Sequence, residues 1–486
     1  MDALTDLAAR ARAFTASRPR SGCVVNDIHS QLNPTTVARI IRPRASGELQ
    51  ELVAAARGAS QALSVCGGRH AMGGQQFGTG ATLIDMSALN RVIDVDRERG
   101  LVTVEAGIDW VQLINHLLWT FADQREAWTI VQKQTGADHL TLGGALASNV
   151  HGRGLRLRPF VADVESFTLL DSTGHPQVCS RSINPRLFAL AAGGYGLFGP
   201  VTTITLRLQL RRKLERRVTI ANVVDLPELF DRRIREGYEY GDCQFATDPA
   251  SREFLHAGVF SCYRPVDADQ PFPERQLSLG ATDWRRLLRL AHTDKSRAFA
   301  EYSRYYMATD GQLYWSDTHQ LSDYPESYHA ELDAELGSGA RGTEMITELY
   351  VPRAALPDFM HAVRADALQH RLDIIYGTIR VIEPDDETVL AWARQRWACV
   401  VFNLHVVHTP EGIARAILDF RRLIDRAIQF GGSYYLTYHR WADARQLLAC
   451  HPRIHEFLQE KRRFDPCGIF RSDWYSHHER LLGSAS

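Results

Sequence analysis

The chain lacks several features that would assign it to a familiar class. No apolar run reaches the length that spans a bilayer, and the first residues, Met1 to Asp6, do not show the basic-then-apolar pattern of a secretion signal. The 56 basic and 57 acidic residues give a net charge of −1, which provides no general attraction to nucleic acid or to an anionic membrane. We therefore expect no transmembrane segment and no nucleic-acid partner.

Cysteine is scarce and scattered. The 486 residues include 8 cysteines, none of them in a Cys-x-x-Cys pair. This spacing indicates neither a zinc site nor a disulfide framework, and it is typical of reduced thiols in a cytoplasmic protein. His405 and His408 lie three residues apart in a strand-like segment, so their side chains would point to opposite faces and would not form a metal pair. We expect a cytoplasmic location and no metal.

Common nucleotide and nucleophile motifs are also missing. The chain has no phosphate loop of the G-x-x-x-x-G-K-[ST] type and no G-x-S-x-G elbow. Gly194 to Gly199 formally matches G-x-G-x-x-G, but a predicted helix over residues 185–192 precedes it and a predicted strand over 201–210 follows it. A dinucleotide-binding turn of the Rossmann type needs the reverse order, so that interpretation is excluded. The small residues of this loop could still pack against a flat ligand.

The length predicts two domains, and the order of elements predicts an α+β fold. Predicted strands and helices alternate up to about residue 210, whereas residues 215–430 mix long charged helices with strands and residues 431–486 form a last segment. We interpret the acidic run at residues 383–387 as a solvated turn. The clearest expected elements are strands over 36–41, 82–86, 344–351, 374–382 and 398–407, helices over 48–57 and 109–118, and a hairpin over 92–106.

Two glycine clusters are the strongest local signals. In the first, four glycines surround His70 directly after a strand-like segment, in the sequence Cys66 to Gln76. Because glycine lacks a Cβ atom, such a loop can turn its backbone N–H groups toward an anion, although a glycine-rich turn with a stray histidine is the alternative. In the second cluster, the small residues 143–148 follow Thr141 and precede Asn149. This run could lie under a planar ring or could simply pack closely.

The C-terminal segment is rich in aromatic residues. Residues 432–441 predict a strand with Tyr434, Leu436 and Tyr438 on one face and Tyr435 and His439 on the other. The alternative for Tyr438 is a packed aromatic side chain with a satisfied hydroxyl. A basic helix and the sequence FDPCGIFRSD, residues 464–473, close the segment.

Taken in order, the loop around His70, residues 141–152, the turn at 196–201 and the FDPCGIFRSD segment resemble the vanillyl-alcohol oxidase family of flavoproteins, which has a PCMH-type FAD-binding domain. The branch with sugar-lactone oxidases, decaprenylphosphoryl-ribose oxidase and a sterol side-chain reductase looks most similar. The resemblance implies a two-subdomain FAD-binding domain at 35–212 after an N-terminal extension at 1–34. It also implies an α+β cap domain with an antiparallel sheet at 213–430 and a return to the FAD domain at 431–486.

The resemblance further implies which residues hold FAD. Many members bind the flavin 8α-methyl group covalently through a histidine that corresponds to His70, although the ribose oxidase binds FAD noncovalently. This chain departs from the family pattern with Arg69 in place of a glycine and Ala71 in place of a serine. The implied cofactor-binding residues are Cys66, Gly67, Gly68, Arg69, His70, Ala71, Met72, Gly74, Gly136, Thr141, Leu142, Gly143, Gly144, Ser148, Asn149, Val150, His151, Val201 and Tyr435.

The implied chemistry is oxidation of a CH–OH carbon in a sugar-like, polyol or lactone substrate, with hydride transfer to flavin N5 and a protein base that accepts the proton. Two alternatives remain: a double-bond reductase that uses NADPH, and a flavin-holding protein without turnover. The expected partner is a small-molecule substrate, and the electron acceptor, dioxygen or another, is left open. The candidate catalytic residues are Arg380, Asn403, His405, Tyr438 and His439.

Overall fold

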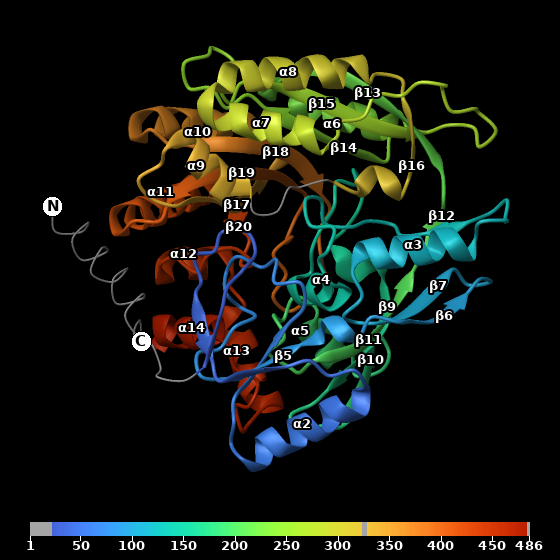
Figure 1. The fold of residues 1–486 in the computed structure, drawn as a ribbon, viewed down its shortest axis with the longest axis vertical. Coiled ribbons are helices and arrows are strands. Elements are labelled where there is room, and N and C mark those ends of the chain that lie inside the picture. Colours follow the sequence, from blue (N-terminus) through green and yellow to red (C-terminus); the bar gives the residue numbers. More distant parts are fainter. Residues whose placement is uncertain (1–21, 323–327, 484–486) are drawn as a thin grey trace.

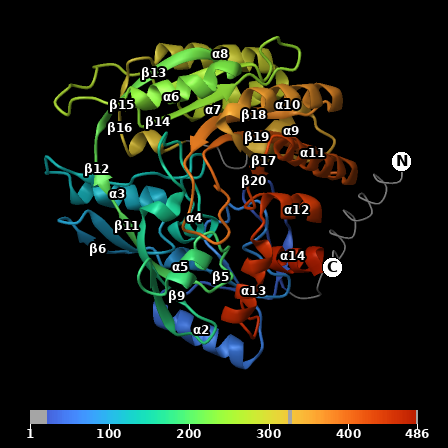
Figure 2. The same ribbon diagram turned by 180° about the vertical axis from the view of Figure 1, so that it is seen from behind.

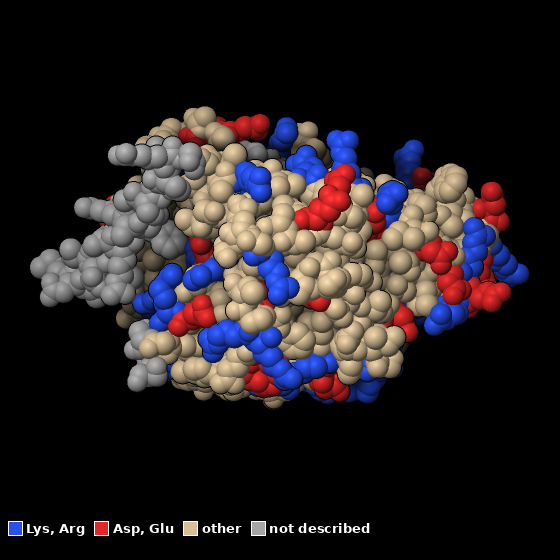
Figure 3. Space-filling view, turned by 90° about the horizontal axis from the view of Figure 1, so that it is seen from below, with Lys and Arg blue, Asp and Glu red and all other residues tan. Residues whose placement is uncertain are grey.

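The computed structural model describes residues 22–322 and 328–483. Met1 to Asp6 and the rest of the first 21 residues of the expected N-terminal extension lie outside these ranges. The chain mixes helices and sheets, so the prediction is confirmed at that level (Figure 1). Within the described ranges no helix is both long enough and apolar enough to cross a membrane. Basic and acidic side chains are interspersed on the face shown in Figure 3.

A small parallel sheet begins the N-terminal half. Its strand order is β3-β5-β4, and α2 connects β3 to β4 as a crossover helix. Leu49, Val53 and Ala56 are buried on one face of α2, which packs that face against the sheet. The first glycine cluster begins where β4 ends. The bounds are β3 Arg39–Ile41, α2 Ser46–Gly58, β4 Leu63–Cys66 and β5 Thr82–Asp85, after a separate pair of strands, β1 Cys23–Val25 and β2 Thr35–Val37.

A five-stranded antiparallel sheet with the order β10-β9-β11-β7-β6 completes this half. Helix α3 begins with a capping box formed by Asp109 and Gln112, and α4 contains most of the second glycine cluster. The bounds are β6 Val92–Asp96, β7 Leu101–Glu105, α3 Trp110–Thr120, α4 Leu142–Ser148, β9 Val164–Leu170, β10 Pro176–Ser180, α5 Pro185–Ala191 and β11 Val201–Arg207, with β8 Trp128–Thr129 paired to β12 Gln209–Leu210.

An eight-stranded antiparallel sheet dominates the second half, in the order β16-β13-β15-β14-β18-β19-β17-β20 (Figures 1 and 2). The strand bounds are β13 Lys213–Asn222, β14 Tyr240–Phe245, β15 Ala257–Pro265, β16 Leu313–Trp315, β17 Gly342–Pro352, β18 Ile374–Ile382, β19 Trp397–Val407 and β20 Ser433–Tyr434. The helix bounds are α6 Leu226–Arg235, α7 Ala281–Thr293, α8 Lys295–Ala308, α9 Tyr328–Leu336, α10 Leu356–His370 and α11 Pro410–Gln429.

The two faces of this sheet have different neighbours. Helices α10 and α11 pack against β17 on one face, and α11 buries a continuous apolar stripe there. The opposite face, which we call the inner face, carries Glu344 and Glu348 of β17. Glu344 contacts α7 through His292, and Glu348 contacts the N-terminal half through His151. Polar side chains of the inner face are therefore enclosed between the two halves of the chain.

The last helices return to the N-terminal half. Helices α12 Ala444–Cys450, α13 Ile454–Phe464 and α14 Asp473–Gly483 follow β20, and the segment between α13 and α14 pairs with β4 through a parallel bridge between Leu63 and Phe470. Leu63 N donates to the carbonyl of Ile469 at 2.6 Å, and Arg471 N donates to the carbonyl of Leu63 at 2.8 Å. The FDPCGIFRSD sequence thus extends the small parallel sheet.

Two expected strands differ from the structure. The strand expected over 36–41 is divided at Ala38 between β2 and β3, which belong to different sheets. The strand expected over 432–441 is wrong beyond Tyr434, where the chain leaves the sheet and turns so that Tyr438 N lies 3.4 Å from the Tyr435 carbonyl. The turn directs Tyr435 toward Ser148 of the N-terminal half and Tyr438 toward Glu348 of β17, which an extended strand could not do because residues three apart face opposite ways.

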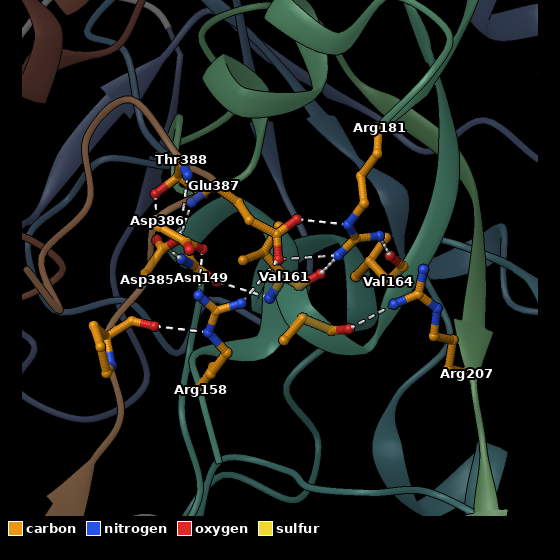
Figure 4. Close-up of polar contacts among 12 residues, drawn as sticks. Asn149, Arg158, Val161, Val164, Arg181, Arg207, Asp385, Asp386, Glu387 and Thr388 are labelled. Atoms are coloured by element: carbon orange, nitrogen blue, oxygen red, sulfur yellow. Dashed lines mark hydrogen bonds and ion pairs between the residues drawn. The ribbon is translucent and has the colours of Figure 1, made fainter. Parts of the chain in front are cut away.

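The acidic run at 383–387 is also different from the solvated turn that we expected (Figure 4). Asp385 is 6% exposed and accepts a hydrogen bond from Asn149 Nδ2 at 3.0 Å. Glu387 forms an ion pair with Arg181 at 2.6 Å. Carboxylates that are buried at an interface need such donors, because an unpaired charge there is costly. The run therefore connects the loop after β18 to the N-terminal half.

Candidate functional site

One cavity brings the glycine clusters together. Its walls come from the loop after β4, the beginning of α4, and the turn before β11. Segments that are about 70 and 130 residues apart in the sequence therefore share a single site. The lining residues are Val65, Cys66, Gly67, Gly68, Arg69, His70, Ala71, Gln75, Gln76, Met86, Ala106, Leu140, Thr141, Gly143, Gly144, Ala147, Ser148, Tyr195, Gly196, Gly199, Pro200 and Val201.

Close approach of the two clusters requires glycine at two positions. A Cβ atom on Gly67 would lie 2.0 Å from Thr141 Oγ1, and a Cβ atom on Gly68 would lie 2.5 Å from the His139 carbonyl oxygen. Both separations are far inside van der Waals contact, so larger residues would force the loops apart. These glycines are needed for the convergence itself.

Arg69 has an unusual backbone conformation. Its φ angle is 59°, in the left-handed region that glycine adopts without steric cost. This explains physically why glycine suits the position in the pattern that the loop resembles. In this chain the arginine side chain instead lines the cavity.

His70 is buried at the cavity wall and is uncharged. Its Nδ1 lies 3.0 Å from His29 Nε2, whereas its Nε2 has no hydrogen-bond partner among the described residues. Burial, with His29 as the second cause, lowers the pKa of His70 to about 3. A neutral imidazole with an available nitrogen is a nucleophile at neutral pH.

The C-terminal turn packs against residues of the cavity wall. Tyr435 Oη donates to the Ser148 carbonyl at 2.6 Å, and Gln75 Nε2 donates to Thr437 Oγ1 at 2.9 Å. Thr437 also accepts from Gly73 N, at 3.1 Å, through its carbonyl oxygen. The turn that breaks the expected strand therefore contacts both glycine clusters.

Several expected cofactor residues lie behind the wall rather than on it. Asn149 adopts a left-handed conformation at the end of α4, and its amide bridges Asp385 and the Val161 backbone. Gly136 N donates to Ser322 Oγ at 2.9 Å. The expected residues that do not line the cavity are Met72, Gly74, Gly136, Leu142, Asn149, Val150, His151 and Tyr435.

A buried hydrogen-bond network lies beside the C-terminal turn and has Glu348 at its centre. Tyr438 Oη donates to Glu348 Oε1 at 2.7 Å, and Tyr350 Oη donates to Glu348 Oε2 at 2.9 Å. His151 Nε2 also lies 2.9 Å from Oε2. Glu348 is 1% exposed, so these contacts replace the water that would otherwise solvate its charge.

The electrostatics of the network fix its protonation. Burial raises the pKa of Glu348, but the His151 ring, the hydrogen bonds from His151 and Tyr438, and nearby Arg380 together lower it to about 2. Burial, followed by the Glu348 carboxylate, raises the pKa of Tyr438 well above its usual value of 10. Glu348 is thus a carboxylate and Tyr438 is a neutral phenol whose proton points at it.

Arg380 is the cation of this region. It is 6% exposed, and its Nε has no hydrogen-bond partner among the described residues. Arg380 pairs in register with Cys399, and Cys399 pairs with Tyr350, so all three share the inner face with Glu348. A buried guanidinium with an unused donor is suited to a polar or anionic ligand group.

The other expected catalytic residues lie elsewhere. Asn403 donates to Glu344 at the far end of β17, and His405 lies nearby with its ring centroid 5.1 Å from that of His292. His439 stacks on Trp441 at 4.2 Å, and burial, followed by Arg440, lowers its pKa to about 3. The structure therefore brings Tyr438 and Arg380 to one place and separates Asn403, His405 and His439 from it.

His151, Glu348 and Cys399 also satisfy a simple distance test for a metal site. Among the described residues theirs are the ligand atoms that gather within 4.8 Å of one another. Burial and Glu348 raise the pKa of Cys399 well above its usual value, so the sulfur remains a thiol rather than the thiolate that metals prefer. The tyrosine hydroxyls already bind both carboxylate oxygens of Glu348. We therefore describe the group as a hydrogen-bond network.

Sequence reasoning missed some residues of the site. Glu348 lies in a strand of mostly apolar residues, and Met86 and Ala106 line the cavity without any local motif. One available signal was that Glu344, Glu348 and Tyr350 are separated by even numbers of residues, which places all three side chains on one face of a predicted strand.

A second cavity, of about 560 Å³, lies on the other side of β13 and is separate from this site. Its arginines are largely neutralised, because Arg233 pairs with Glu236, Arg264 pairs with Glu215 and Arg217 pairs with Asp310. None of the glycine-cluster residues lines it. We therefore place the functional site at the glycine clusters.

Comparison with known families identifies the N-terminal half. Residues 37–180 match the family described as FAD binding domain, so this part of the chain is an FAD-binding domain. The cavity lies largely within the matched segment and fits such a ligand in its glycine-lined walls and in the available nitrogen of His70. The cofactor of the chain is FAD.

Named proteins with similar sequences include oxidases and dehydrogenases of sugar lactones. L-Gulonolactone oxidase of Mus musculus is 32% identical over 167 residues, which are 34% of this chain and 36% of the length of that relative. L-Gulono-1,4-lactone dehydrogenase of Mycobacterium tuberculosis is 24% identical over 91% of this chain and 96% of its own length. L-Galactono-1,4-lactone dehydrogenase 2, mitochondrial, of Oryza sativa subsp. japonica is 28% identical over 39% of this chain and 32% of its own length.

Proposed function

We propose that this chain, whose residues 37–180 form an FAD-binding domain, is an FAD-dependent oxidoreductase that oxidises a CH–OH carbon of a sugar-like, polyol or lactone substrate. One observation carries the proposal: the cavity of the FAD-binding domain lies beside the buried Tyr438–Glu348 network. The names of the similar proteins agree with this class of substrate. Bound FAD would supply a hydride acceptor.

The residues around Glu348 would orient the substrate and move its proton. Arg380 would donate to the reacting oxygen and stabilise the negative charge that develops there. The substrate hydroxyl proton would pass to Tyr438 Oη while the phenol proton passes to Glu348 Oε1, along the existing 2.7 Å hydrogen bond. His151 would hold Glu348 in place from the opposite side, at 2.9 Å.

The domain division is part of the proposal. The three-stranded sheet and the five-stranded sheet would form the two subdomains of an FAD-binding domain at 35–212, and the eight-stranded sheet would form a cap at 213–430. Residues 431–486 would return to the FAD-binding domain, and residues 1–34 would precede it. A cytoplasmic location remains a prediction from the cysteine pattern.

We also propose that FAD is bound covalently through His70. His70 would hold the cofactor through a ring nitrogen bonded to the flavin 8α-methyl carbon; forming that bond would release one proton from the methyl group, the N–H proton of the imidazole and two electrons to the external acceptor that reoxidises the enzyme. The buried, uncharged ring supports this role, because its pKa lies at about 3 and its Nε2 is unpartnered. After acid precipitation the yellow colour should stay in the pellet, and His70→Ala should release it.

The control for this experiment is His139→Ala, whose exposed side chain lies on the neighbouring segment. It should keep the colour in the pellet. Colour that moves entirely into the supernatant from the unmodified protein would refute the covalent bond and leave FAD binding intact.

The activity is tested by mixing the purified flavoprotein anaerobically with L-gulono-1,4-lactone, L-galactono-1,4-lactone and a panel of polyols. Bleaching of the flavin by one of these compounds supports the proposed oxidation. Bleaching by NADPH alone would contradict it and indicate a reductase instead. If no compound bleaches the flavin, the oxidoreductase proposal fails.

A further inference from the structure

Five buried polar side chains on the inner face of β14, β15 and β18 have polar atoms without hydrogen-bond partners. Each side chain is at most 7% exposed, and none of these atoms has a hydrogen-bond partner among the described residues. Buried polar groups in folded proteins are nearly always paired, so a cluster of exceptions needs an explanation. The atoms are Ser261 Oγ, Asp242 Oδ1, Gln244 Oε1, Thr378 Oγ1 and Arg380 Nε, and we call these residues the polar patch.

Strand register places the polar patch on three neighbouring strands. Asp242 of β14 pairs with Ser261 of β15, and Gln244 of β14 pairs with Thr378 of β18. Asp242 and Gln244 are two residues apart, as are Thr378 and Arg380, so all five side chains point to one face. Strand spacings of about 5 Å and a two-residue repeat of about 7 Å make the patch roughly 10 Å by 7 Å, the size of a small sugar.

The same register connects the patch to the proposed reaction site. Thr378 pairs with Val401, and Val401 pairs with Glu348, so Gln244, Thr378 and Glu348 lie in one row across the sheet. Two strand spacings, about 10 Å, separate Thr378 from Glu348. Arg380, on the β18 side of the patch, acts electrostatically on Glu348.

One aromatic side chain beside the patch is partly exposed. Tyr376 precedes Thr378 by two residues in β18 and is 39% exposed, although β18 is a central strand of the sheet. Tyr376 pairs with Asn403, which lies on the inner face with Glu348. A partly exposed aromatic ring on this face can pack against the C–H surface of a sugar.

The chemistry of the patch selects hydroxyl groups. Asp242 and Gln244 contribute unpaired acceptors, Ser261 and Thr378 contribute hydroxyls that can donate or accept, and Arg380 contributes a donor. Gln244 Nε2 donates to Asp242 Oδ2 at 3.0 Å, which fixes the direction of both side chains. Asp242 interacts electrostatically with the buried cation Arg153, so this end of the patch is close to neutral overall and suits an uncharged ligand.

We propose that the polar patch binds hydroxyl groups of the substrate that are remote from the carbon being oxidised. The ligand class is a neutral polyhydroxylated molecule of about five or six carbons, with its reacting end at Tyr438 and Arg380 and its other end at Asp242, Gln244 and Ser261. This inference rests on the proposed function, because it assigns the specificity of the same site.

The test uses the purified flavoprotein and neutral polyols of three, four, five and six carbons. Apparent Kd and limiting rate are taken from anaerobic flavin reduction at increasing polyol concentration. In the unmodified protein, affinity should rise with chain length. Asp242→Asn should lower the affinity for the six-carbon polyol about tenfold, since a hydrogen bond to a charged group is lost. It should change the affinity for the three-carbon polyol less than twofold.

Two further variants keep the test independent of folding. Thr378→Val removes one hydroxyl of the patch at constant shape and should lower the affinity for the six-carbon polyol several-fold. Asp267→Asn makes the same change as Asp242→Asn on an exposed turn after β15 and should leave all affinities unchanged. Equal affinity for three-carbon and six-carbon polyols in the unmodified protein, or an Asp242→Asn variant that binds both as the unmodified protein does, would overturn the inference.

Failure of the proposed function gives a different result. If no polyol or lactone reduces the flavin, binding is measured instead from the thermal stabilisation of the flavoprotein by the six-carbon polyol. A stabilisation that Asp242→Asn abolishes and Asp267→Asn preserves supports the patch as a sugar-binding site without the proposed oxidation. No stabilisation of the unmodified protein by any polyol overturns the patch as well.

Discussion

Replacing Glu348 with glutamine should uncouple the proposed proton path while leaving FAD in place. The amide has the same shape, but one of its two ends becomes a donor. Tyr350 and His151 both contact Oε2, and Tyr438 contacts Oε1, so either orientation of the amide directs an N–H group at a donor. Glu348 does not line the cavity formed by the glycine clusters, and FAD content should therefore be unchanged.

The magnitude follows from the burial of the network. Breaking a buried charged network by altering one member costs about 3–5 kcal/mol. At about 2.1 cal/mol/K of unfolding entropy per residue, a chain of 486 residues that unfolds as one unit would lose about 3–5 °C in Tm. The limiting rate of flavin reduction should fall about 100-fold or more, the usual contribution of positioned proton transfer.

The assay combines thermal unfolding, the flavin-to-protein absorbance ratio and anaerobic flavin reduction. Glu411→Gln, on the exposed first turn of α11, is the matched control and should change none of the three. Tyr438→Phe should slow reduction similarly, and the double variant should be no slower than either single one, because both disrupt the same path. A Glu348→Gln variant with an unchanged Tm and an unchanged rate would refute the reasoning.

Two further predictions concern stability. Arg69→Gly removes a left-handed arginine with a φ angle of 59° and should raise the free energy of unfolding by about 1 kcal/mol, measured by denaturant titration; a decrease would mean that the side chain contributes more than its backbone strain costs. The free energy of unfolding should depend steeply on pH in acid. Burial lowers the pKa of three histidines to about 3, whereas the pKa of an unfolded histidine lies near 6.5. Their contribution is fully present above pH 6.5 and is lost as the pH falls toward 3, at about 1.4 kcal/mol per pH unit for each histidine near pH 5. Asp163 acts in the opposite direction, since burial raises its pKa to about 7, and it offsets about one of the protons that the buried histidines take up on unfolding near pH 5; no change of Tm between pH 7 and 5 would contradict the assignment. The histidines are His439, His451 and His478.

The glycine clusters were predictable because their constraint is local. Loops that must approach as closely as Gly67 and Thr141 do can use only glycine at the contact, and that requirement appears directly in the sequence. The long strands β17, β18 and β19 and the helices expected over 48–57 and 109–118 were predictable for a related reason, since apolar spacing reports which side of each element is buried. The strand at 82–86 was also expected, but its parallel pairing with β3 and β4 was not.

The C-terminal turn was not predictable from spacing. Residues 432–441 alternate aromatic and polar side chains as a strand does, yet only Ser433 and Tyr434 pair with β17. The chain turns because Tyr435 reaches Ser148 and Tyr438 reaches Glu348, two partners that lie far away in the sequence. Long-range hydrogen bonds of this kind overrode the local pattern, and no single-chain periodicity records them.

The inner face shows why buried polar residues are the hardest part of a site to read. Thr378 and Arg380 lie in a strand whose other residues are almost all apolar, and a strand that is buried on both faces shows no clean alternation. Polar residues in such a strand destabilise the fold unless a hydrogen-bond partner satisfies them. Glu348 is paired by two tyrosines and a histidine, whereas Asp242, Gln244, Ser261, Thr378 and Arg380 each keep an unpaired atom on the same face. The contrast separates the part of the face that the chain satisfies by itself from the part that a hydroxylated ligand would complete.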